Sequence, residues 1–317
     1  MSVIDQIRNA KKTLFTFELL PPLKGASLER VYNAIDNLVE FEPAYINFTS
    51  HRDEVQYSEG PDGTFIRKTL RKRPGTIAMA AAVKYKYNIN VVPHLLCGGF
   101  SREETENALI EMNFLGIDDV LALRGDPPRG SRLFIPEADG HSYTSELVEQ
   151  IADLNNGKYL DGKPGRDTGT SFCIGVAGYP EKHLEAPNMA TDLANLKRKV
   201  DAGASYIVTQ MFFSNDHFHA FVKSCREMGI TVPIIPGIKP VTALNDIKLL
   251  PQTFNIDLPD DLVKELMKCK TDDDAREAGI EWGIMQTKDL IRSGVPGIHY
   301  YTLGRSDNVA RIVKGGY

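Results

Sequence analysis

The pentapeptide Arg124-Gly125-Asp126-Pro127-Pro128 combines residue types that could bind a ligand and act on it. It directly follows the apolar run Val120–Leu123, which is typical of a buried strand. In α/β proteins, ligands bind at the carboxyl ends of such strands, and a glycine there lets the backbone approach them closely. The motif therefore indicates one side of a ligand site. A plain turn from strand to loop is the alternative interpretation.

A second carboxylate, Glu18, lies among apolar residues in the run Thr13–Leu19. An ionised carboxylate in such surroundings is costly unless it is paired or functional. A carboxyl group in an apolar pocket favours its protonated form, which is the form that a general acid needs. Glu18 is therefore a candidate general acid, and a salt-bridged structural carboxylate is the alternative.

Polar residues also lie within or after other apolar runs. They are Thr49, Ser50, His51, Arg52, His94, Tyr179, His183, Thr209, Gln210 and Arg305. A lone histidine in a strand is more often a core residue than a ligand, so the argument depends on the convergence of these strand ends. No pair or triplet has the spacing of metal ligands, and the sequence has no nucleophile elbow or Ser-His-Asp signature.

Eight short apolar runs, separated by segments with helical periodicity, are expected to position these residues. Near-continuous apolar runs are typical of strands that are buried on both faces of a parallel sheet. The pattern predicts an α/β protein with a (β/α)8 TIM-barrel fold, in which residues 1–317 form a single domain with an extra N-terminal helix and loop insertions. A doubly wound sheet is the alternative, but the sequence has no GxGxxG motif after its first strand and no GxxxxGK[ST] motif. The predicted strands are Thr13–Leu19, Ala44–Thr49, Asn90–Leu96, Val120–Leu123, Ser171–Ala177, Tyr206–Phe212, Val232–Ile238 and Gly297–Leu303.

The segments between these runs include six predicted helices and two irregular loops. In a barrel, Gly125–His141 would lie on the catalytic face because it follows a strand, and Asn155–Gly169 would lie on the opposite face because it precedes one. Ser101 and Glu104 form a capping box at the start of one helix. The predicted helices are Leu28–Val39, Ser101–Leu115, Ser145–Leu154, Met189–Val200, Asp216–Met228 and Asp274–Ile291.

The predicted helix Met189–Val200 has an apolar stripe beside a polar one. At 100° per residue, Leu193, Leu196 and Val200 share a face. The adjacent polar stripe contains Asp192, Asn195, Lys199 and, at its edge, Arg198. A solvated face is the usual meaning of such a stripe, and recognition of an anionic, hydroxyl-rich ligand such as a dinucleotide is the alternative.

The composition excludes several functional classes. The net charge of -5 and the pI of about 5.9 argue against nucleic acid as a partner. No apolar run approaches the roughly 20 residues of a membrane span, and the first residues lack the apolar core of a signal peptide. The four cysteines are widely spaced and form no CxxC pair, so we expect a cytoplasmic protein with free, buried thiols at Cys97 and Cys173 and no metal site.

In their order along the chain, these motifs resemble the methylenetetrahydrofolate reductase family. The resemblance covers nearly the whole chain and corresponds to a bacterial-type catalytic domain. It includes no counterpart of the C-terminal regulatory domain of eukaryotic relatives, so control by S-adenosylmethionine is not expected. The matching motifs are Phe17-Glu18-Leu19-Leu20-Pro21-Pro22, Pro93-His94-Leu95, Leu123-Arg124-Gly125-Asp126-Pro127-Pro128, Ala177-Gly178-Tyr179-Pro180-Glu181 with His183, Asn195-Leu196-Lys197-Arg198-Lys199-Val200-Asp201-Ala202-Gly203-Ala204, Thr209-Gln210-Met211-Phe212-Phe213, Ile235-Pro236-Gly237-Ile238 and Tyr300-Tyr301-Thr302-Leu303-Gly304-Arg305.

The resemblance implies that FAD binds at the catalytic face of the barrel. It implies that NADH or NADPH reduces the flavin and leaves, and that 5,10-methylenetetrahydrofolate then takes the same place and accepts the hydride. It also implies a homo-oligomer, because the family forms dimers and tetramers. A flavin-free pterin-binding barrel that acts as a transferase or lyase is the alternative, and a non-catalytic flavin or folate binder is a third possibility.

Residue roles follow from the same resemblance. Glu18 corresponds to the general acid, which helps to protonate N10 so that the imidazolidine ring opens. Asp126 corresponds to the aspartate beside flavin and pterin, whose charge disfavours an anionic reduced flavin. Gln210 and Arg305 correspond to substrate-binding residues. The positions that correspond to FAD contacts are Thr49, Ser50, His94, Arg124, Gly125, Asp126, Thr144, Tyr179, His183, Asp192, Asn195, Arg198 and Lys199.

The chain departs from the family pattern at two places. Ser50-His51-Arg52 stand where many relatives carry Tyr-Gly-Ala. Asp246 aligns with a glutamine of many relatives, and Leu250 lies near the position of a phenylalanine. These are flavin-side and substrate-side positions, so we expect the local packing of both ligands to differ.

Overall fold

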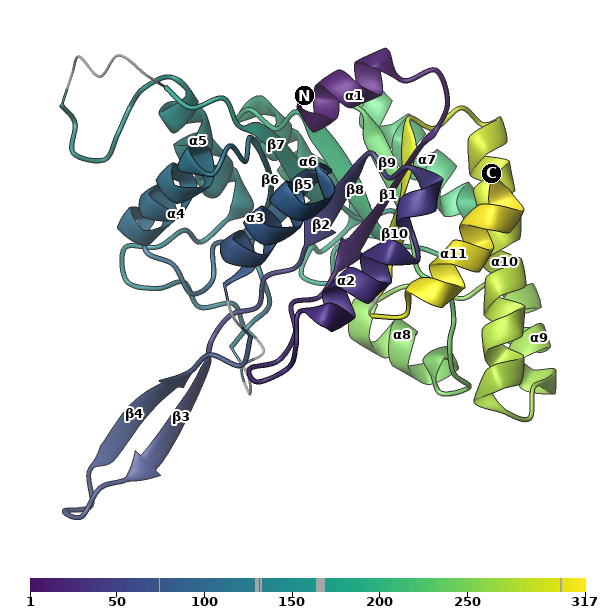
Figure 1. The fold of residues 1–317 in the computed structure, drawn as a ribbon, viewed down its shortest axis with the longest axis horizontal. Coiled ribbons are helices and arrows are strands. Elements are labelled where there is room, and N and C mark those ends of the chain that lie inside the picture. The colour runs from purple at the N-terminus through teal and green to yellow at the C-terminus, as the bar shows by residue number, and fades with distance from the viewer. Residues whose placement is uncertain (74, 129–130, 132, 164–168, 303) are drawn as a thin grey trace.

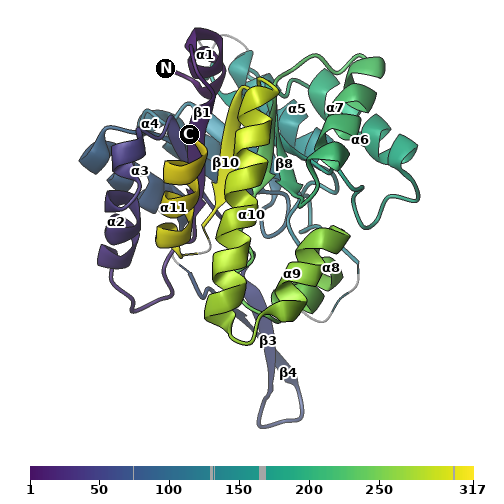
Figure 2. The same ribbon diagram turned by 90° about the vertical axis from the view of Figure 1, so that its right-hand side faces the viewer.

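Eight parallel strands close into a barrel that is surrounded by helices (Figures 1 and 2). The barrel strands are β1 (Leu14–Leu19), β2 (Tyr45–Phe48), β5 (Asn90–Leu96), β6 (Asp119–Leu123), β7 (Cys173–Gly178), β8 (Tyr206–Met211), β9 (Ile234–Ile238) and β10 (Gly297–Tyr301). Their hydrogen-bonded order is β1-β10-β9-β8-β7-β6-β5-β2, so the first strand lies between the last strand and the second. This computed structural model describes residues 1–73, 75–128, 131, 133–163, 169–302 and 304–317. The predicted (β/α)8 fold is confirmed.

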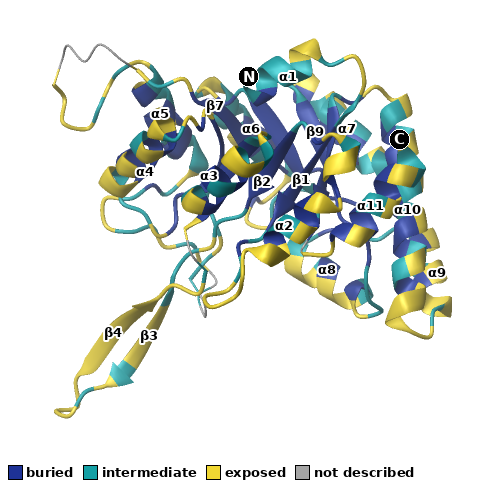
Figure 3. Cartoon of the chain, in the orientation of Figure 1, coloured by how far each residue is buried: buried dark blue, intermediate teal, exposed yellow. Residues whose placement is uncertain are grey.

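Each barrel strand overlaps one of the eight predicted apolar runs. The agreement has a simple cause, because the strands are covered by helices outside and by side chains inside, and both faces are therefore apolar. Figure 3 shows the barrel strands as buried elements beneath more exposed helices. The last predicted run ended at Leu303, which lies outside the described residues.

The helices cover the outside of the barrel. Ser101 and Glu104 form the predicted capping box, since the Ser101 hydroxyl accepts from Glu104 N at 3.2 Å and the Glu104 carboxylate accepts from Ser101 N at 2.8 Å. Within the described part of the chain, no helix has both the length and the apolar character of a membrane span. The helices are α1 (Val3–Asn9), α2 (Glu29–Asp36), the short 3-10 helix η1 (Val39–Phe41), α3 (Thr76–Tyr87), α4 (Arg102–Phe114), α5 (Thr144–Asn155), α6 (Met189–Asp201), α7 (Asn215–Glu227), α8 (Asp246–Phe254), α9 (Asp260–Lys268), α10 (Asp272–Arg292) and α11 (Ser306–Gly316).

The N-terminal helix α1 closes the amino end of the barrel. Val3 packs with Tyr45, Tyr206 and other side chains inside this end. The main-chain N–H of Val3 donates to the buried carboxylate of Asp119 at 2.8 Å, which ties α1 to β6. The opposite end of the barrel is therefore the end that is open to ligands.

The two predicted loops leave the barrel at opposite ends. Gly125–His141 follows β6 at the carboxyl end, although residues 129–130 and 132 lie outside the described part. Asn155–Gly169 connects α5 to β7 at the end where α1 lies (Figure 1), and residues 164–168 are likewise outside the described part. The predicted free, buried thiols of Cys97 and Cys173 are confirmed.

A two-stranded hairpin was not predicted from the sequence. Strands β3 (Glu54–Glu59) and β4 (Phe65–Leu70) pair with each other in antiparallel register and belong to no other sheet. The hairpin projects from the barrel at the end opposite α1 (Figures 1 and 2). We call residues 54–70 the arm. The sequence analysis missed this hairpin because charged residues interrupt the alternation of polar and apolar side chains in its two strands.

Candidate active site at the open end of the barrel

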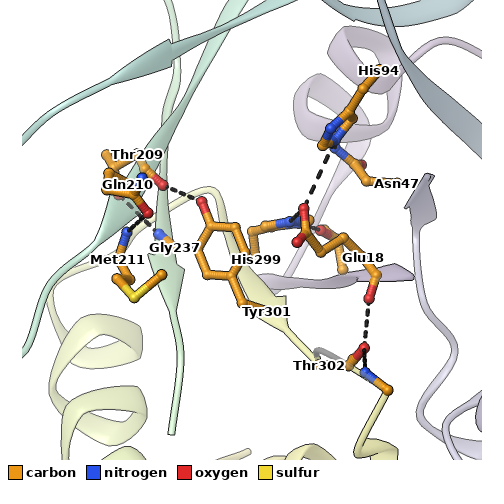
Figure 4. Close-up of polar contacts among 12 residues, drawn as sticks. Glu18, Asn47, His94, Thr209, Gln210, Met211, Gly237, His299, Tyr301 and Thr302 are labelled. Atoms are coloured by element: carbon orange, nitrogen blue, oxygen red, sulfur yellow. Dashed lines mark hydrogen bonds and ion pairs between the residues drawn. The ribbon is translucent and has the colours of Figure 1, made fainter. Parts of the chain in front are cut away.

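Glu18 lies at the carboxyl end of β1 inside the barrel mouth, where only 7% of its surface is exposed. Its Oε2 is 3.8 Å from Nε2 of His94 and 3.7 Å from Nε2 of His299 (Figure 4). The Thr302 hydroxyl donates to the main-chain oxygen of Glu18 at 2.7 Å and fixes this strand end. The carboxyl group is thus held between two imidazoles, which are groups that can exchange protons.

His299 is a site residue that the sequence analysis missed. Its ring is buried in β10, and Nδ1 lies 2.7 Å from the hydroxyl oxygen of Thr16. Strands β1 and β10 pair so that Thr16 is opposite His299 and Glu18 is opposite Tyr301. The predicted barrel could have indicated His299, because barrel closure makes the first and last strands neighbours and brings their inward-facing residues together.

The side of the mouth beside β2 and β5 contains polar atoms without partners. Burial lowers the pKa of His94 to about 4, against the effect of the Glu18 carboxylate, so this imidazole is neutral near pH 7. The Asn47 amide nitrogen lies 3.4 Å from Nε2 of His94. The Asn47 Oδ1 and Thr49 Oγ1 atoms are buried and have no hydrogen-bond partner among the described residues. Buried polar atoms are almost always hydrogen-bonded, so these two oxygens indicate a ligand position.

Tyr301 lies between Glu18 and Gln210 and forms the opposite wall of the mouth (Figure 4). Its hydroxyl donates to the main-chain oxygen of Thr209 at 2.6 Å. Burial, with a further contribution from Glu18, raises the pKa of Tyr301 well above its ordinary value, so the phenol stays protonated. Gln210 is half-buried, and its side-chain oxygen accepts from Met211 N at 2.9 Å.

Gly125 and Asp126 follow β6 at the same end of the barrel. Gly125 has φ of +84°, and a Cβ there would lie 3.4 Å from the side chain of Leu96, so this turn favours glycine. Asp126 is exposed. Burial and Arg73 lower the pKa of His51, whereas the carboxylates of Asp126 and Glu18 act in the opposite direction. His51 is therefore close to both predicted catalytic carboxylates.

Arg124 and the loop after β7 form a second polar group. The Arg124 guanidinium makes a bidentate ion pair with Glu185 at 2.6 and 2.7 Å and lies 4.9 Å from the Phe134 ring centre. The rings of Tyr179 and His183 are in edge contact at 4.6 Å. Burial raises the pKa of Tyr179 to about 12, and it lowers the pKa of His183.

Helix α6 places its four predicted FAD residues in two different settings. The Asp192 carboxylate accepts from the main-chain N–H of His183 at 2.9 Å, and the Lys199 ammonium donates to the main-chain oxygen of Ala177 at 2.6 Å. Burial lowers the pKa of Lys199 to about 8. Asn195 and Arg198 are exposed and bond to each other at 3.1 Å. Asp192 and Lys199 therefore hold the β7–α6 loop, whereas Arg198 presents its charge to solvent.

The substrate-side departure at Asp246 has a partner that the sequence analysis missed. Lys239 follows β9, and its ammonium lies 3.7 Å from the Asp246 carboxylate, with both side chains buried. Burial lowers the pKa of Lys239, and the nearby charge of Arg305 acts in the same direction. Arg305 itself is exposed at the start of α11.

Two other predicted FAD residues, Ser50 and Thr144, are half-buried. Ser50 lies just after β2, and Thr144 lies at the start of α5.

Comparison with known proteins gives a consistent result. The sequence model described as "Methylenetetrahydrofolate reductase" matches residues 3–315. The chain is 30% identical over 293 residues to 5,10-methylenetetrahydrofolate reductase of Escherichia coli, which covers 92% of this chain and 86% of the bacterial protein. It is 33% identical over 316 residues to methylenetetrahydrofolate reductase (NADH) 1 of Arabidopsis thaliana. This match covers 96% of this chain and 48% of the plant protein.

The chain spans about half the length of the plant, worm and yeast relatives that it matches. A solved structure, described as an uncharacterized protein from Clostridium thermocellum that binds two copies of 5-methyl-5,6,7,8-tetrahydrofolic acid, has a similar fold with a TM-score of 0.60. The two chains are 13% identical, and the match covers 98% of this chain and 96% of the other. The family match over residues 3–315 and the identity to the bacterial enzymes show that this chain belongs to the methylenetetrahydrofolate reductase family.

Proposed function

We propose that this protein reduces 5,10-methylenetetrahydrofolate to 5-methyltetrahydrofolate, with NADH or NADPH as the electron donor and FAD as the cofactor. The observation that carries the proposal is the buried carboxyl group of Glu18 between His94 and His299 at the open end of a barrel of this family. Reduction by ping-pong hydride transfer requires one proton for each folate molecule that is reduced. Glu18 is positioned to supply that proton.

Glu18 acts as the general acid in this proposal. Its carboxyl group is buried in the mouth and lies between two imidazoles, so it is positioned to transfer a proton to a bound ligand. Protonation of N10 by this group opens the imidazolidine ring of the bound folate, and the proton that leaves Glu18 remains on N10. Positioned acid catalysis of this kind contributes about 10²- to 10⁴-fold in rate.

Several features of the mouth fit FAD. The buried Asn47 and Thr49 oxygens, which have no partner among the described residues, offer hydrogen-bond positions to a polar ring edge. The exposed Arg198 offers a cation to the pyrophosphate. When bound, FAD would supply the hydride-transfer chemistry between the nicotinamide and the folate. The residues that would hold it are Thr49, Ser50, His94, Arg124, Gly125, Asp126, Thr144, Tyr179, His183, Asp192, Asn195, Arg198 and Lys199.

The folate and the nicotinamide nucleotide would occupy the same side of the mouth in turn. Gln210 and Arg305 are the proposed substrate-binding residues, with Asp126 beside the pterin. The buried ion pair between Lys239 and Asp246 lies near Arg305, so we expect the packing next to the folate to differ from that in relatives with glutamine at this position. We further propose a cytoplasmic homo-oligomer in which residues 1–317 act as one catalytic domain.

Anaerobic spectroscopy of the purified protein tests the proposal. We expect a yellow protein whose flavin absorption is bleached by NADH or NADPH and restored by methylenetetrahydrofolate, with formation of the 5-methyl product. Separate titrations with the two nucleotides identify the electron donor. A colourless protein that binds a pterin would instead support a flavin-free transferase or lyase. Flavin that folate does not reoxidise would contradict the reductase activity.

A further inference from the structure

The arm exposes an unusual density of apolar side chains. Tyr57 is 66% exposed and Phe65 is 71% exposed, and Val55, Ile66 and Leu70 are exposed as well. Figure 3 shows the arm as a mostly exposed ribbon beyond the buried barrel. Within the described part of the chain, no hydrogen bond or ion pair joins residues 55–70 to the barrel. A two-stranded hairpin is marginally stable without a packed face, so this arm needs a covering surface.

The apolar residues occupy both faces of the arm. Tyr57 pairs with Arg67, and Glu59 pairs with Phe65, so these four side chains lie on one face together with Val55. Ser58 pairs with Ile66, and Glu54 pairs with Leu70. The apolar residues on this other face are therefore aliphatic. The face with Tyr57 and Phe65 therefore has the two aromatic side chains that typically anchor an interface.

The base of the arm is fixed in place. The Arg71 guanidinium bonds to both carboxylate oxygens of Asp53 at 3.1 to 3.2 Å, and Lys72 pairs with Glu54 at 2.6 Å. Arg73 bonds to the main-chain oxygen of Pro21. The first two pairs close the base of the hairpin, and the Arg73 contact joins that base to the loop after β1. A surface that is already ordered loses little conformational entropy on binding.

We propose that the Tyr57–Phe65 face of the arm docks against the arm of a second copy of this chain. Charge complementarity favours this occupant. This face of the arm carries one acidic residue, Glu59, and one basic residue, Arg67. A two-fold axis places the face against an identical face, so Glu59 of one copy can meet Arg67 of the other. A nucleic acid or another strongly charged partner would find no such match, because the face carries both signs of charge.

The test is the molecular mass of the purified full-length chain, measured by light scattering and sedimentation at several concentrations. We expect a multiple of 35.2 kDa for the unchanged chain. The variant with Tyr57→Glu and Phe65→Glu is expected to associate about 100-fold more weakly, because it removes both aromatic anchors and adds like charges. Phe114→Glu is the matched control, since Phe114 is 81% exposed on α4, and it should leave the mass unchanged.

A second variant keeps the test decisive if the charged one folds poorly. Residues 55–69 are replaced by two glycines, which suits the register because Glu54 and Leu70 are directly paired. We expect this variant to be a monomer, lighter than the 35.2 kDa of the full chain by the mass of the removed residues, with the melting temperature of the barrel retained. The proposal would be overturned if the unchanged chain is monomeric at every concentration measured, or if an oligomer survives removal of the arm. The outcome does not depend on catalysis, since a colourless oligomer that dissociates without its arm would uphold this inference and contradict the reductase function.

Discussion

Oε2 of Glu18 lies 3.7 Å from Nε2 of His299, and both side chains are buried. The other ring nitrogen of His299 faces the Thr16 hydroxyl at 2.7 Å, and a hydroxyl can donate or accept a hydrogen bond. His299 can therefore present either an N–H or a lone pair to Glu18. The carboxyl group thus keeps a suitable partner both before and after it releases a proton.

Glu18→Gln should separate the two halves of the catalytic cycle. Glutamine has nearly the same shape but carries no transferable proton at this position. We expect reoxidation of reduced flavin by methylenetetrahydrofolate to fall by about 10²- to 10⁴-fold, while flavin reduction by the nucleotide stays within twofold. Stopped-flow absorbance measures both rates. Unchanged reoxidation would remove Glu18 from the proposed mechanism.

His299→Phe should slow the folate step through Glu18. Removal of the ring nitrogens takes away one of the two imidazoles that hold the Glu18 carboxyl group in position. We expect a loss of about tenfold in reoxidation rate, with nucleotide oxidation unaffected. His299→Gln should recover part of the rate. The control is His219→Phe on α7, whose side chain is 41% exposed. An equal loss of rate in both half-reactions would indicate a purely structural role for His299.

His94 should make folding stability depend on pH. Its pKa of about 4 in the folded protein is below the ordinary value of 6.5, so the unfolded chain binds a proton first as the pH falls. The stability is fully present above pH 6.5 and is lost as the pH falls toward 4, by at most about 3 kcal/mol. Urea unfolding of His94→Asn between pH 4 and 7 should show a flatter dependence than the unchanged chain. His219→Asn should retain the original slope, and equal slopes for all three proteins would contradict the assignment.

The buried pair of Lys239 and Asp246 should show strong coupling. Either Lys239→Met or Asp246→Asn leaves one buried group without its partner, which costs about 3 to 5 kcal/mol. The double variant with Lys239→Met and Asp246→Asn should recover most of that loss, since no unpaired charge remains. Urea unfolding measures the double-mutant cycle. The exposed pair of Lys264 and Asp261 provides the control and should contribute no more than about 1 kcal/mol. Additive losses at the buried pair would exclude the coupling.

The fold was predictable because its signal is local. Runs such as Asn90–Leu96 and Tyr206–Phe212 are apolar along their whole length, which reflects burial on both faces of each strand. The capping box at Ser101 is likewise a short-range pattern. The arm was missed because Arg67 and Lys68 separate its apolar residues, and because its strands pack on nothing in the described chain that would require a regular pattern.

The site was only partly predictable. Glu18 was identifiable because a carboxylate among apolar residues is unusual within one strand. His299 was not, because its role depends on the pairing of β1 with β10 across barrel closure. Lys239 was missed for a similar reason, since only the structure brings it to Asp246. The proposed roles of the FAD and folate residues come from the family resemblance, and their test is the spectroscopy described above.

The pairing of β1 with β10 also has a consequence for synthesis of the protein. Glu18 is made near the beginning of the chain, whereas Thr16 must wait for His299, a residue 283 positions later, to form its hydrogen bond. A ribosome-bound chain that has not yet released β10 therefore holds Glu18 without His299 or Tyr301. The proposed acid therefore needs the last barrel strand, since an unfinished chain has Glu18 but lacks two of the side chains that surround it in the complete barrel.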